Sequence, residues 1–175
     1  ADTMQITAAV VEGAGADFAI QNVTLDAPRA DEILVRIHAA GICHTDTSCR
    51  DAGAGSIFPA VLGHEGAGIV ERVGAKVEGF VPGDRVAITF RSCGGCRKCR
   101  GGHPAYCETM PALNYVGRRP DGTSAISRDG EPIGSNFFGQ SSFATYAIAY
   151  ATNLVKIPDE LPLYLAAPLG CGIQT

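Results

Sequence analysis

Alternation of apolar and polar residues is the clearest pattern along this chain, and it predicts strands rather than helices. Residues 32–40 place Ile33, Val35 and Ile37 on one face, which is the period-two pattern of a half-buried strand. Shorter apolar runs follow, bounded by glycine, proline or aspartate. We therefore expect strands at residues 5–11, 18–23, 32–40, 67–73, 85–90, 142–151 and 153–157.

Turn signals separate these strands, and helical signals are few. Aspartate–glycine pairs within residues 120–123 and 128–131 predict hairpin turns. Two short helices are expected, over residues 45–50 and 161–169, with a loop between residues 51 and 60. With 22 glycines and 10 prolines, the chain is predicted to be mainly β (α+β), in the form of a partly open barrel.

Charge and composition argue against nucleic-acid binding and membrane insertion, and they favour metal binding. A net charge of -4 gives no electrostatic footprint for nucleic acid. No apolar run is long enough to span a bilayer, and no signal peptide precedes the first strand, so a cytoplasmic location is expected without a membrane partner. The seven cysteines are an odd number with several Cys-x-x-Cys spacings, which favours metal binding over disulfides.

Four of these cysteines define a lobe at residues 91–111. They follow the spacing C-x2-C-x2-C-x7-C and comprise Cys93, Cys96, Cys99 and Cys107. The segment has too few apolar residues to pack alone, so a structural zinc would supply folding free energy. An iron–sulfur cluster is the alternative, but its bacterial motif has three residues before the last cysteine, where this chain has seven. Free buried thiols are a further alternative.

A second candidate metal set is spread along the chain. Cys43 and His64 each have a carboxylate nearby, Asp46 and Glu65, and Cys171 follows far downstream. Thiolate and imidazole are preferred zinc ligands, and a set of only three leaves a fourth tetrahedral position open. Taken singly, each residue has an ordinary structural interpretation, as a buried thiol or a hydrogen-bonded histidine.

The context of these residues resembles a known family. Gly63-His64-Glu65-Gly66-Ala67-Gly68, followed by Gly74 and Val77, resembles the zinc signature of medium-chain alcohol dehydrogenases. Cys43-His44-Thr45-Asp46, the four-cysteine lobe and Gly170-Cys171-Gly172 recur in that family in this order. The segments 137–146 and 169–175 are most similar to those of aryl (benzyl) alcohol dehydrogenases. The resemblance implies a GroES-like catalytic domain over residues 1–175 that oxidises a primary, aryl-type alcohol with NAD.

The resemblance also implies roles for individual residues. Cys43, His64 and Cys171 would bind a catalytic zinc, the ligand set found in alcohol dehydrogenases. A zinc-bound alkoxide would then transfer hydride to the nicotinamide. Thr45 would accept the alcohol proton, although as a sequence feature Thr45 or Asp46 could equally be a helix N-cap. Asp46 would orient the His64 imidazole, and Glu65 would approach the metal or act only as an outer carboxylate.

Cofactor and proton-relay positions follow from the same resemblance. His44 would lie near the cofactor pyrophosphate, and Thr175 would touch the nicotinamide. Many relatives end the relay in a histidine where this chain has Ser48, so the proton would leave directly to water or through another group. Two zinc ions per chain are expected, one catalytic and one structural.

The substrate pocket is expected to be aromatic. Its candidate residues are Ile57, Thr89, Phe90, Phe137 and Phe138. A phenylalanine pair beside the metal would suit a flat ring. Both rings could instead belong to the ordinary core.

The chain lacks the G-x-G-x-x-G motif of a dinucleotide-binding domain. A Rossmann domain is therefore expected after residue 175, in a parent enzyme that forms a homodimer or homotetramer. The alternatives are a noncatalytic, zinc-stabilised GroES-like interaction module, and a dehydrogenase of the same family for another alcohol, such as a formaldehyde adduct, a sugar or a short alcohol.

Overall fold

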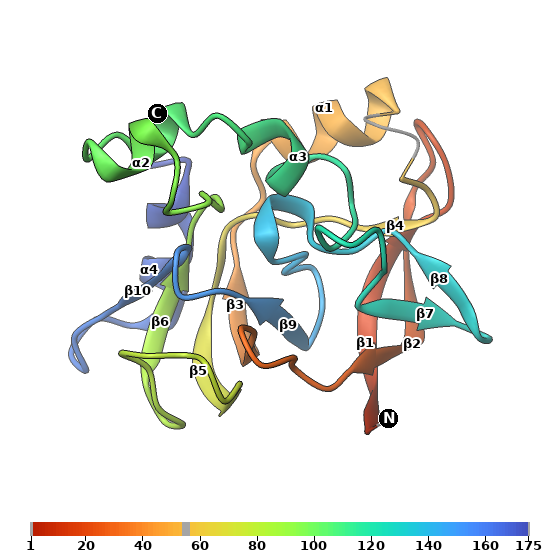
Figure 1. Cartoon of the computed structure of the whole chain (residues 1–175). Helices are drawn as coiled ribbons and strands as arrows, with labels where there is room; N and C mark the ends of the chain where they lie inside the picture. Colours follow the sequence, from red (N-terminus) through yellow and green to blue (C-terminus); the bar gives the residue numbers. More distant parts are fainter. Residues whose placement is uncertain (1, 54–56, 175) are drawn as a thin grey trace.

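The computed structural model describes residues 2–53 and 57–174, and within them two antiparallel sheets of five strands face each other (Figure 1). The first sheet runs in the order β4 (Ala60–Val61), β1 (Thr3–Val11), β2 (Phe18–Asp26), β7 (Ile126–Arg128) and β8 (Glu131–Ile133). The second runs β10 (Leu154–Lys156), β6 (Arg85–Ile88), β5 (Gly66–Val73), β3 (Ile33–Ala40) and β9 (Tyr146–Ala149). The sheets do not close, so the mainly β, partly open barrel is confirmed.

Two hydrophobic cores explain why β3 differs from its predicted pattern. Ile33 and Val35 pack with β5 and β6 in one core, as the alternation predicts. Leu34, on the opposite face, is also buried, because it packs with β1 and β2 in the other core. The first half of β3 is therefore buried on both faces, and only its second half alternates with solvent.

The predicted strand at residues 142–151 is shorter than expected. β9 covers only Tyr146–Ala149, while residues 142–145 join the two sheets. The Phe143 N–H donates to the Leu62 carbonyl over 3.0 Å, and the Phe143 carbonyl accepts from the Ala9 N–H over 2.8 Å. A backbone bridge pairs Ala8 with Ala144. The prediction of a strand in this apolar run was correct for its second half, but the first residues pair across the barrel rather than along one sheet.

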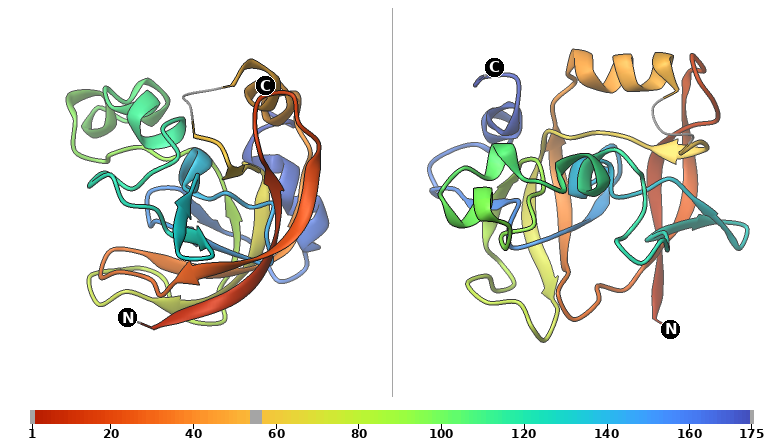
Figure 2. Two further views of the ribbon diagram at one scale, coloured as in Figure 1. Left: turned by 90° about the vertical axis from the view of Figure 1, so that its right-hand side faces the viewer. Right: turned by 45° about the horizontal axis from the view of Figure 1, so that its top comes forward.

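Helices are short: α1, α2 and α3 lie at one end of the barrel (Figure 1), while α4 packs against the second sheet, and Figure 2 shows that the C-terminal segment ends near α1. The helices are α1 (His44–Ala52), α2 (Arg97–Arg100), α3 (Met110–Asn114) and α4 (Leu163–Ala166), with 3₁₀ turns η2 (Pro104–Tyr106), η3 (Phe137–Gly139) and η4 (Ala167–Gly170). The predicted helix at residues 161–169 is split into α4 and η4, because Pro168 cannot donate a helical hydrogen bond. None of the described helices is long and apolar enough to cross a membrane.

The two predicted hairpin turns have different outcomes. Residues 128–131 join β7 to β8, and Asp129 and Gly130 adopt positive φ angles of 52° and 84°, as a two-residue hairpin requires. Residues 120–123 also turn, with the Arg119 N–H donating to the Thr123 carbonyl, but they do not join two of the described strands.

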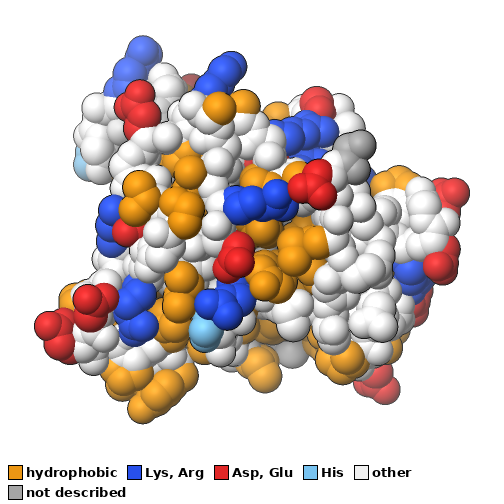
Figure 3. Space-filling view, turned by 90° about the horizontal axis from the view of Figure 1, so that it is seen from below, with side chains coloured by type: hydrophobic (Ala, Val, Ile, Leu, Met, Phe, Trp, Pro, Cys, Tyr) orange, Lys and Arg blue, Asp and Glu red, His pale blue; other side chains and the backbone are white. Residues whose placement is uncertain are grey.

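A buried ion pair fastens the loop before β3 to the turn that follows residue 118. The Arg119 Nε lies 2.7 Å from Glu32 Oε1, and Arg119 Nη1 lies 2.7 Å from Asp26 Oδ2. The Tyr150 hydroxyl adds a hydrogen bond to Glu32. Arg119 and Glu32 are 2% and 1% exposed, so this pair is isolated from solvent. On the surface seen from below, charged side chains of both signs are interspersed with apolar ones (Figure 3).

Candidate metal centres and active site

Three separate segments bring the distributed metal set together. Cys43 immediately precedes α1, His64 lies between β4 and β5, and Cys171 follows η4. Their ligand atoms and a Glu65 carboxylate oxygen all lie within 4.8 Å of one another. The Cys43 and Cys171 sulfurs are 4.0 Å apart, although 128 positions separate the two residues.

Asp46 connects the cysteine and histidine segments. Its Oδ1 lies 2.8 Å from His64 Nδ1 and 3.2 Å from the Gly63 amide nitrogen, while Oδ2 accepts from the Cys43 N–H over 3.2 Å. Cys43 is therefore the N-cap of α1, not Thr45 or Asp46, because the Asp46 carboxylate reaches back from the third helical position. Asp46 is fully buried, so one carboxylate fixes the helix start and the imidazole orientation together.

These residues fit a zinc ion. His64 Nε2 is buried with no hydrogen-bond partner, while Nδ1 is occupied by Asp46. Zinc–sulfur bonds of about 2.3 Å in a tetrahedron place two sulfurs about 3.8 Å apart, close to the observed Cys43–Cys171 spacing. An orphaned imidazole nitrogen facing two thiols is the donor set that a tetrahedral zinc uses, and a carboxylate–histidine pair behind it is its usual support.

The electrostatics of the three ligands also favour a bound cation. Burial opposes ionisation of the Cys43 thiol, but hydrogen bonding from Thr45 and the neighbouring His64 imidazole lower its pKa. Burial and the neighbouring Cys43 sulfur raise the pKa of Cys171 to about 11. Burial opposes protonation of His64, yet Asp46 raises the pKa of the imidazole overall. Two adjacent thiolates repel each other unless a positive charge lies between them.

Glu65 occupies a tight space beside this set. Its Oε1 accepts from the Gly172 N–H over 2.6 Å, which ties the Cys171 segment to the His64 segment. A Cβ on Gly41 would lie 2.0 Å from Glu65 Oε2 and one on Gly172 would lie 2.9 Å from Oε1. Glycine is therefore required at positions 41 and 172, because a larger residue at either one would collide with the Glu65 carboxylate.

The other polar candidates lie around α1. Thr45 is half-buried and contributes to lowering the pKa of the Cys43 thiol, and Ser48 lies one turn further on and is exposed. His44 is exposed at the first position of the helix. Thr175 lies outside the described residues.

A cavity of about 190 Å³ opens beside the metal set. It is lined by His64, Phe90, Phe138, Gly170, Cys171 and Gln174. Phe138 lies over the His64 ring with centroids 4.7 Å apart. Thr89 lines an adjacent cavity of about 340 Å³, which shares Phe90, Gly170 and Gln174 with the first.

The remaining pocket candidates belong to the core rather than to this cavity. Phe137 is fully buried and Ile57 is 3% exposed, and both pack in the same apolar cluster. Sequence reasoning gave the two adjacent phenylalanines the same interpretation, but the backbone directs them differently. Gln174 and Gln140 were not predicted: Gln174 lines the cavity, and Gln140 is hydrogen-bonded to the backbone of His64. Neither glutamine belongs to a motif or a periodic pattern, so the sequence gave no signal of either contact.

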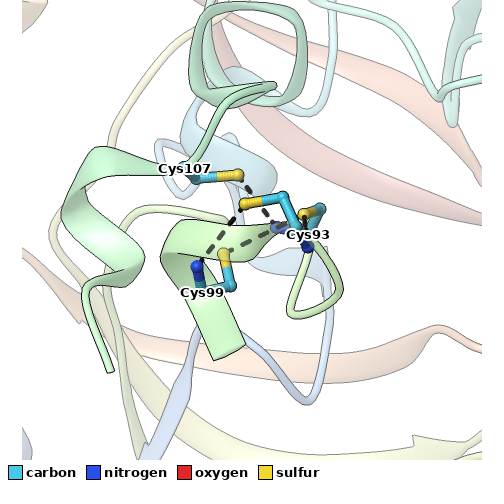
Figure 4. Close-up of side chains that lie close together, drawn as sticks. Cys93, Cys99 and Cys107 are labelled. Atoms are coloured by element: carbon cyan, nitrogen blue, oxygen red, sulfur yellow. Dashed lines mark hydrogen bonds between the residues drawn. The ribbon is translucent and has the colours of Figure 1, made fainter. Parts of the chain in front are cut away.

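The four-cysteine lobe forms the second donor cluster. The sulfurs of Cys93, Cys96, Cys99 and Cys107 lie within 4.8 Å of one another, and none forms a disulfide (Figure 4). Backbone N–H groups of Cys93 and Cys96 donate to neighbouring sulfurs, each over 3.3 Å. Burial raises the pKa of the Cys107 thiol, but hydrogen bonds from Thr109 and Cys93 outweigh it and lower the pKa to about 6. This closed arrangement has the donor chemistry of a structural zinc site.

Comparison with known proteins establishes the family. Residues 29–159 match the alcohol dehydrogenase GroES-like domain, and the chain belongs to this family. It is 49% identical to geraniol dehydrogenase from Castellaniella defragrans over 175 residues, which is 99% of this chain and 47% of that protein.

Two solved structures share the fold at high identity. The alcohol dehydrogenase zinc-binding domain protein from Burkholderia ambifaria has a TM-score of 0.96 at 52% identity, covering 99% of this chain and 47% of the other. Benzyl alcohol dehydrogenase from Acinetobacter calcoaceticus has a TM-score of 0.92 at 43% identity, covering 98% and 46%. The chain thus spans about half the length of the relatives it matches.

Proposed function

We propose that this chain is the catalytic domain of a zinc- and NAD-dependent alcohol dehydrogenase. The observation that carries the proposal is the open three-ligand set beside the aromatic cavity, since a purely structural protein needs only the closed four-cysteine site. When bound by Cys43, His64 and Cys171, zinc supplies Lewis acidity, which lowers the pKa of an alcohol hydroxyl. The geraniol and benzyl alcohol dehydrogenase relatives support this activity.

The chain's own residues would then hold the ligands and move the proton. Asp46 keeps Nε2 of His64 directed at the metal position through its bond to Nδ1. Thr45 would accept the alcohol proton, and its place beside Cys43 supports that role. Glu65 holds the Cys171 segment through Gly172. With Ser48 exposed, the proton would pass to water at the edge of α1.

The substrate would be a small primary alcohol whose carbinol carbon adjoins a flat, unsaturated group, with benzyl-type alcohols first. Phe90 and Phe138 give the cavity two aromatic walls beside His64. Its volume of about 190 Å³ is below the range of roughly 300–1,000 Å³ for drug-sized ligands, which suits a small alcohol. Geraniol, an allylic alcohol, is the alternative suggested by one relative's name.

NAD would bind mainly to a further domain outside these residues, and His44 and Thr175 would contribute from this chain. Holding the nicotinamide and the alcohol in the reactive geometry would lower the barrier to hydride transfer by about 7–11 kcal/mol. This chain alone should therefore bind ligands at the metal without appreciable turnover. With cobalt in place of zinc, an aldehyde, pyrazole or imidazole should perturb the absorption spectrum, while NAD and benzyl alcohol should give no appreciable NADH.

Two experiments test the proposal. Elemental analysis should find two zinc ions per metal-replete chain; a single zinc would favour the noncatalytic module, and iron with sulfide would exclude structural zinc in the lobe. In the complete enzyme, kcat/KM should be higher for benzyl alcohol than for cyclohexylmethanol, which has the same carbon count without the flat ring. Equal values would remove the argument for an aromatic substrate.

A further inference from the structure

Gln140 is buried at a junction between the metal ligands and the cavity walls. It is 2% exposed and directly follows η3. Its Oε1 accepts from the Gly66 N–H over 3.0 Å. Its Nε2 donates to the carbonyls of His64 and Thr89, over 2.9 and 3.2 Å. One side-chain amide therefore joins its own segment to residues 64–66 and to Thr89, so that three chain segments meet at the site.

Each of these segments carries a functional group. His64 is a metal ligand, and Gly66 begins β5 two residues later. Thr89 precedes the cavity residue Phe90, and its hydroxyl donates over 3.0 Å to the carbonyl of Gly170, which precedes Cys171. The amide thus connects the histidine ligand to the backbone beside one cysteine ligand.

The segment that delivers Gln140 has an unusual backbone. Asn136, Phe138 and Ser141 all have positive φ angles, of 56°, 51° and 54°. Such conformations are costly for residues other than glycine and persist only where surrounding contacts hold them. Here the Ser141 hydroxyl bonds to the Val61 carbonyl, and Asn153 donates to the Phe138 and Gly139 carbonyls. The strained turn places the Phe138 ring against the His64 imidazole and the Gln140 amide against the His64 backbone carbonyl.

We propose that Gln140 is a positioning residue, whose amide fixes His64, Phe90 and Phe138 in one rigid frame and so sets both metal affinity and substrate fit. This inference rests on the function proposed above. Outer hydrogen bonds to metal ligands typically change metal affinity or activity by about 10–100-fold when removed. Loss of the amide would also leave the buried His64 carbonyl and the partly buried Thr89 carbonyl without this donor.

The test compares Gln140→Met with Asn114→Leu. Methionine keeps the approximate volume of glutamine without its hydrogen bonds. Asn114 is a matched control, because it is also buried and its amide makes three hydrogen bonds, to the Arg91 N–H, the Arg91 carbonyl and the Met110 carbonyl. Both variants should lower Tm, but only Gln140→Met should weaken cobalt affinity at the three-ligand site, by about 10–100-fold.

Cobalt affinity is measured by chelator competition, with each site followed through its own absorption bands, which differ between four thiolates and two thiolates with an imidazole. In the complete enzyme, Gln140→Met should also lower kcat/KM, whereas Asn114→Leu should not. If Gln140→Met lowers Tm as the control does but leaves cobalt affinity, spectrum and kcat/KM unchanged, Gln140 has only a structural role and the proposal is wrong.

A second variant separates the donors from overall packing. Gln140→Glu keeps the volume and an oxygen that accepts from Gly66, but its ionised carboxylate replaces the donors to His64 and Thr89 with a negatively charged acceptor. It should weaken cobalt affinity at least as much as Gln140→Met does. Wild-type affinity in Gln140→Glu would overturn the proposal even if Gln140→Met fails to fold. If the unsubstituted chain shows no two-thiolate cobalt spectrum, the proposed function itself fails, which is a distinguishable result.

Discussion

The imidazole of His64 and the carboxylate of Asp46 form a fully buried pair, with Nδ1 and Oδ1 2.8 Å apart. Because the same carboxylate accepts from the Cys43 and Gly63 amides, the pair fixes two metal ligands relative to each other. Several consequences of this arrangement, and of the rest of the fold, can be measured.

Asp46→Asn should weaken zinc binding at the three-ligand site by about 10–100-fold while the chain stays folded. Asparagine keeps one oxygen for His64 and Gly63, but its amide nitrogen cannot accept from the Cys43 N–H, and the negative charge that makes the imidazole a better ligand is lost. Chelator competition measures the affinity, and Ser48→Ala, an exposed change on the same helix, is the control. Unchanged affinity in Asp46→Asn would show that the charge of Asp46 is not needed.

Cys96→Ser should destabilise the lobe much more than it disturbs the three-ligand site. Residues 91–111 have few buried apolar side chains, so the metal is their main source of stability. Tm and protease sensitivity of the lobe should both change strongly. Cys49→Ser, which alters a cysteine outside both clusters, should leave the lobe resistant. If Cys96→Ser behaves like Cys49→Ser, the lobe does not depend on a metal.

Thr45→Ala in the complete enzyme should reduce turnover by about 10²–10⁴ while zinc content is unchanged. The hydroxyl lies beside Cys43 and would be the first acceptor of the substrate proton. Thr45→Ser should keep most of the activity, because the hydroxyl remains. Normal kinetics in a fully metallated Thr45→Ala enzyme would exclude the relay role.

The buried pair of Glu32 and Arg119 should make stability fall in acid. Burial raises the pKa of Glu32, but the Arg119 guanidinium outweighs it and leaves the carboxyl pKa below its ordinary value. The contribution is therefore complete above the ordinary glutamate pKa of about 4.3 and is lost as the pH falls below it. Glu32→Ala should cost about 3–5 kcal/mol at neutral pH, because it leaves Arg119 buried without its main partner.

Denaturant unfolding of both proteins between pH 3 and pH 7 provides the measurement. The stability difference between them should shrink toward the acid end. A difference that stays constant over this range would show that ionisation of Glu32 does not contribute.

The sequence predicted local features well because they depend on neighbours in the chain. Alternation located β3, and cysteine spacing located the lobe. Features that depend on distant packing were not predictable: Leu34 is buried because a second core covers it, and β9 is short because residues 142–145 pair across the barrel.

The site shows the same division between local and distant information. The three ligands were predicted from a family resemblance, since no local sequence pattern joins Cys43 to Cys171. Phe137 and Phe138 are indistinguishable in sequence; both are buried in the same apolar cluster, but of the two only Phe138, which has a positive φ, also lines the cavity. Gln140 has no periodic or motif signal, because its partners lie 51 to 76 positions away.

The spacing of the two donor clusters also determines the order in which they can assemble during folding. The lobe cysteines span residues 93–107, so a nearly unfolded chain can gather them by closing short loops. The three-ligand site joins residues 128 positions apart and requires both sheets to be formed first. We expect the lobe to capture the first equivalent of metal during refolding and the three-ligand site to fill later. Stopped-flow refolding with cobalt should therefore show four-thiolate bands before the others, and simultaneous appearance would refute this order.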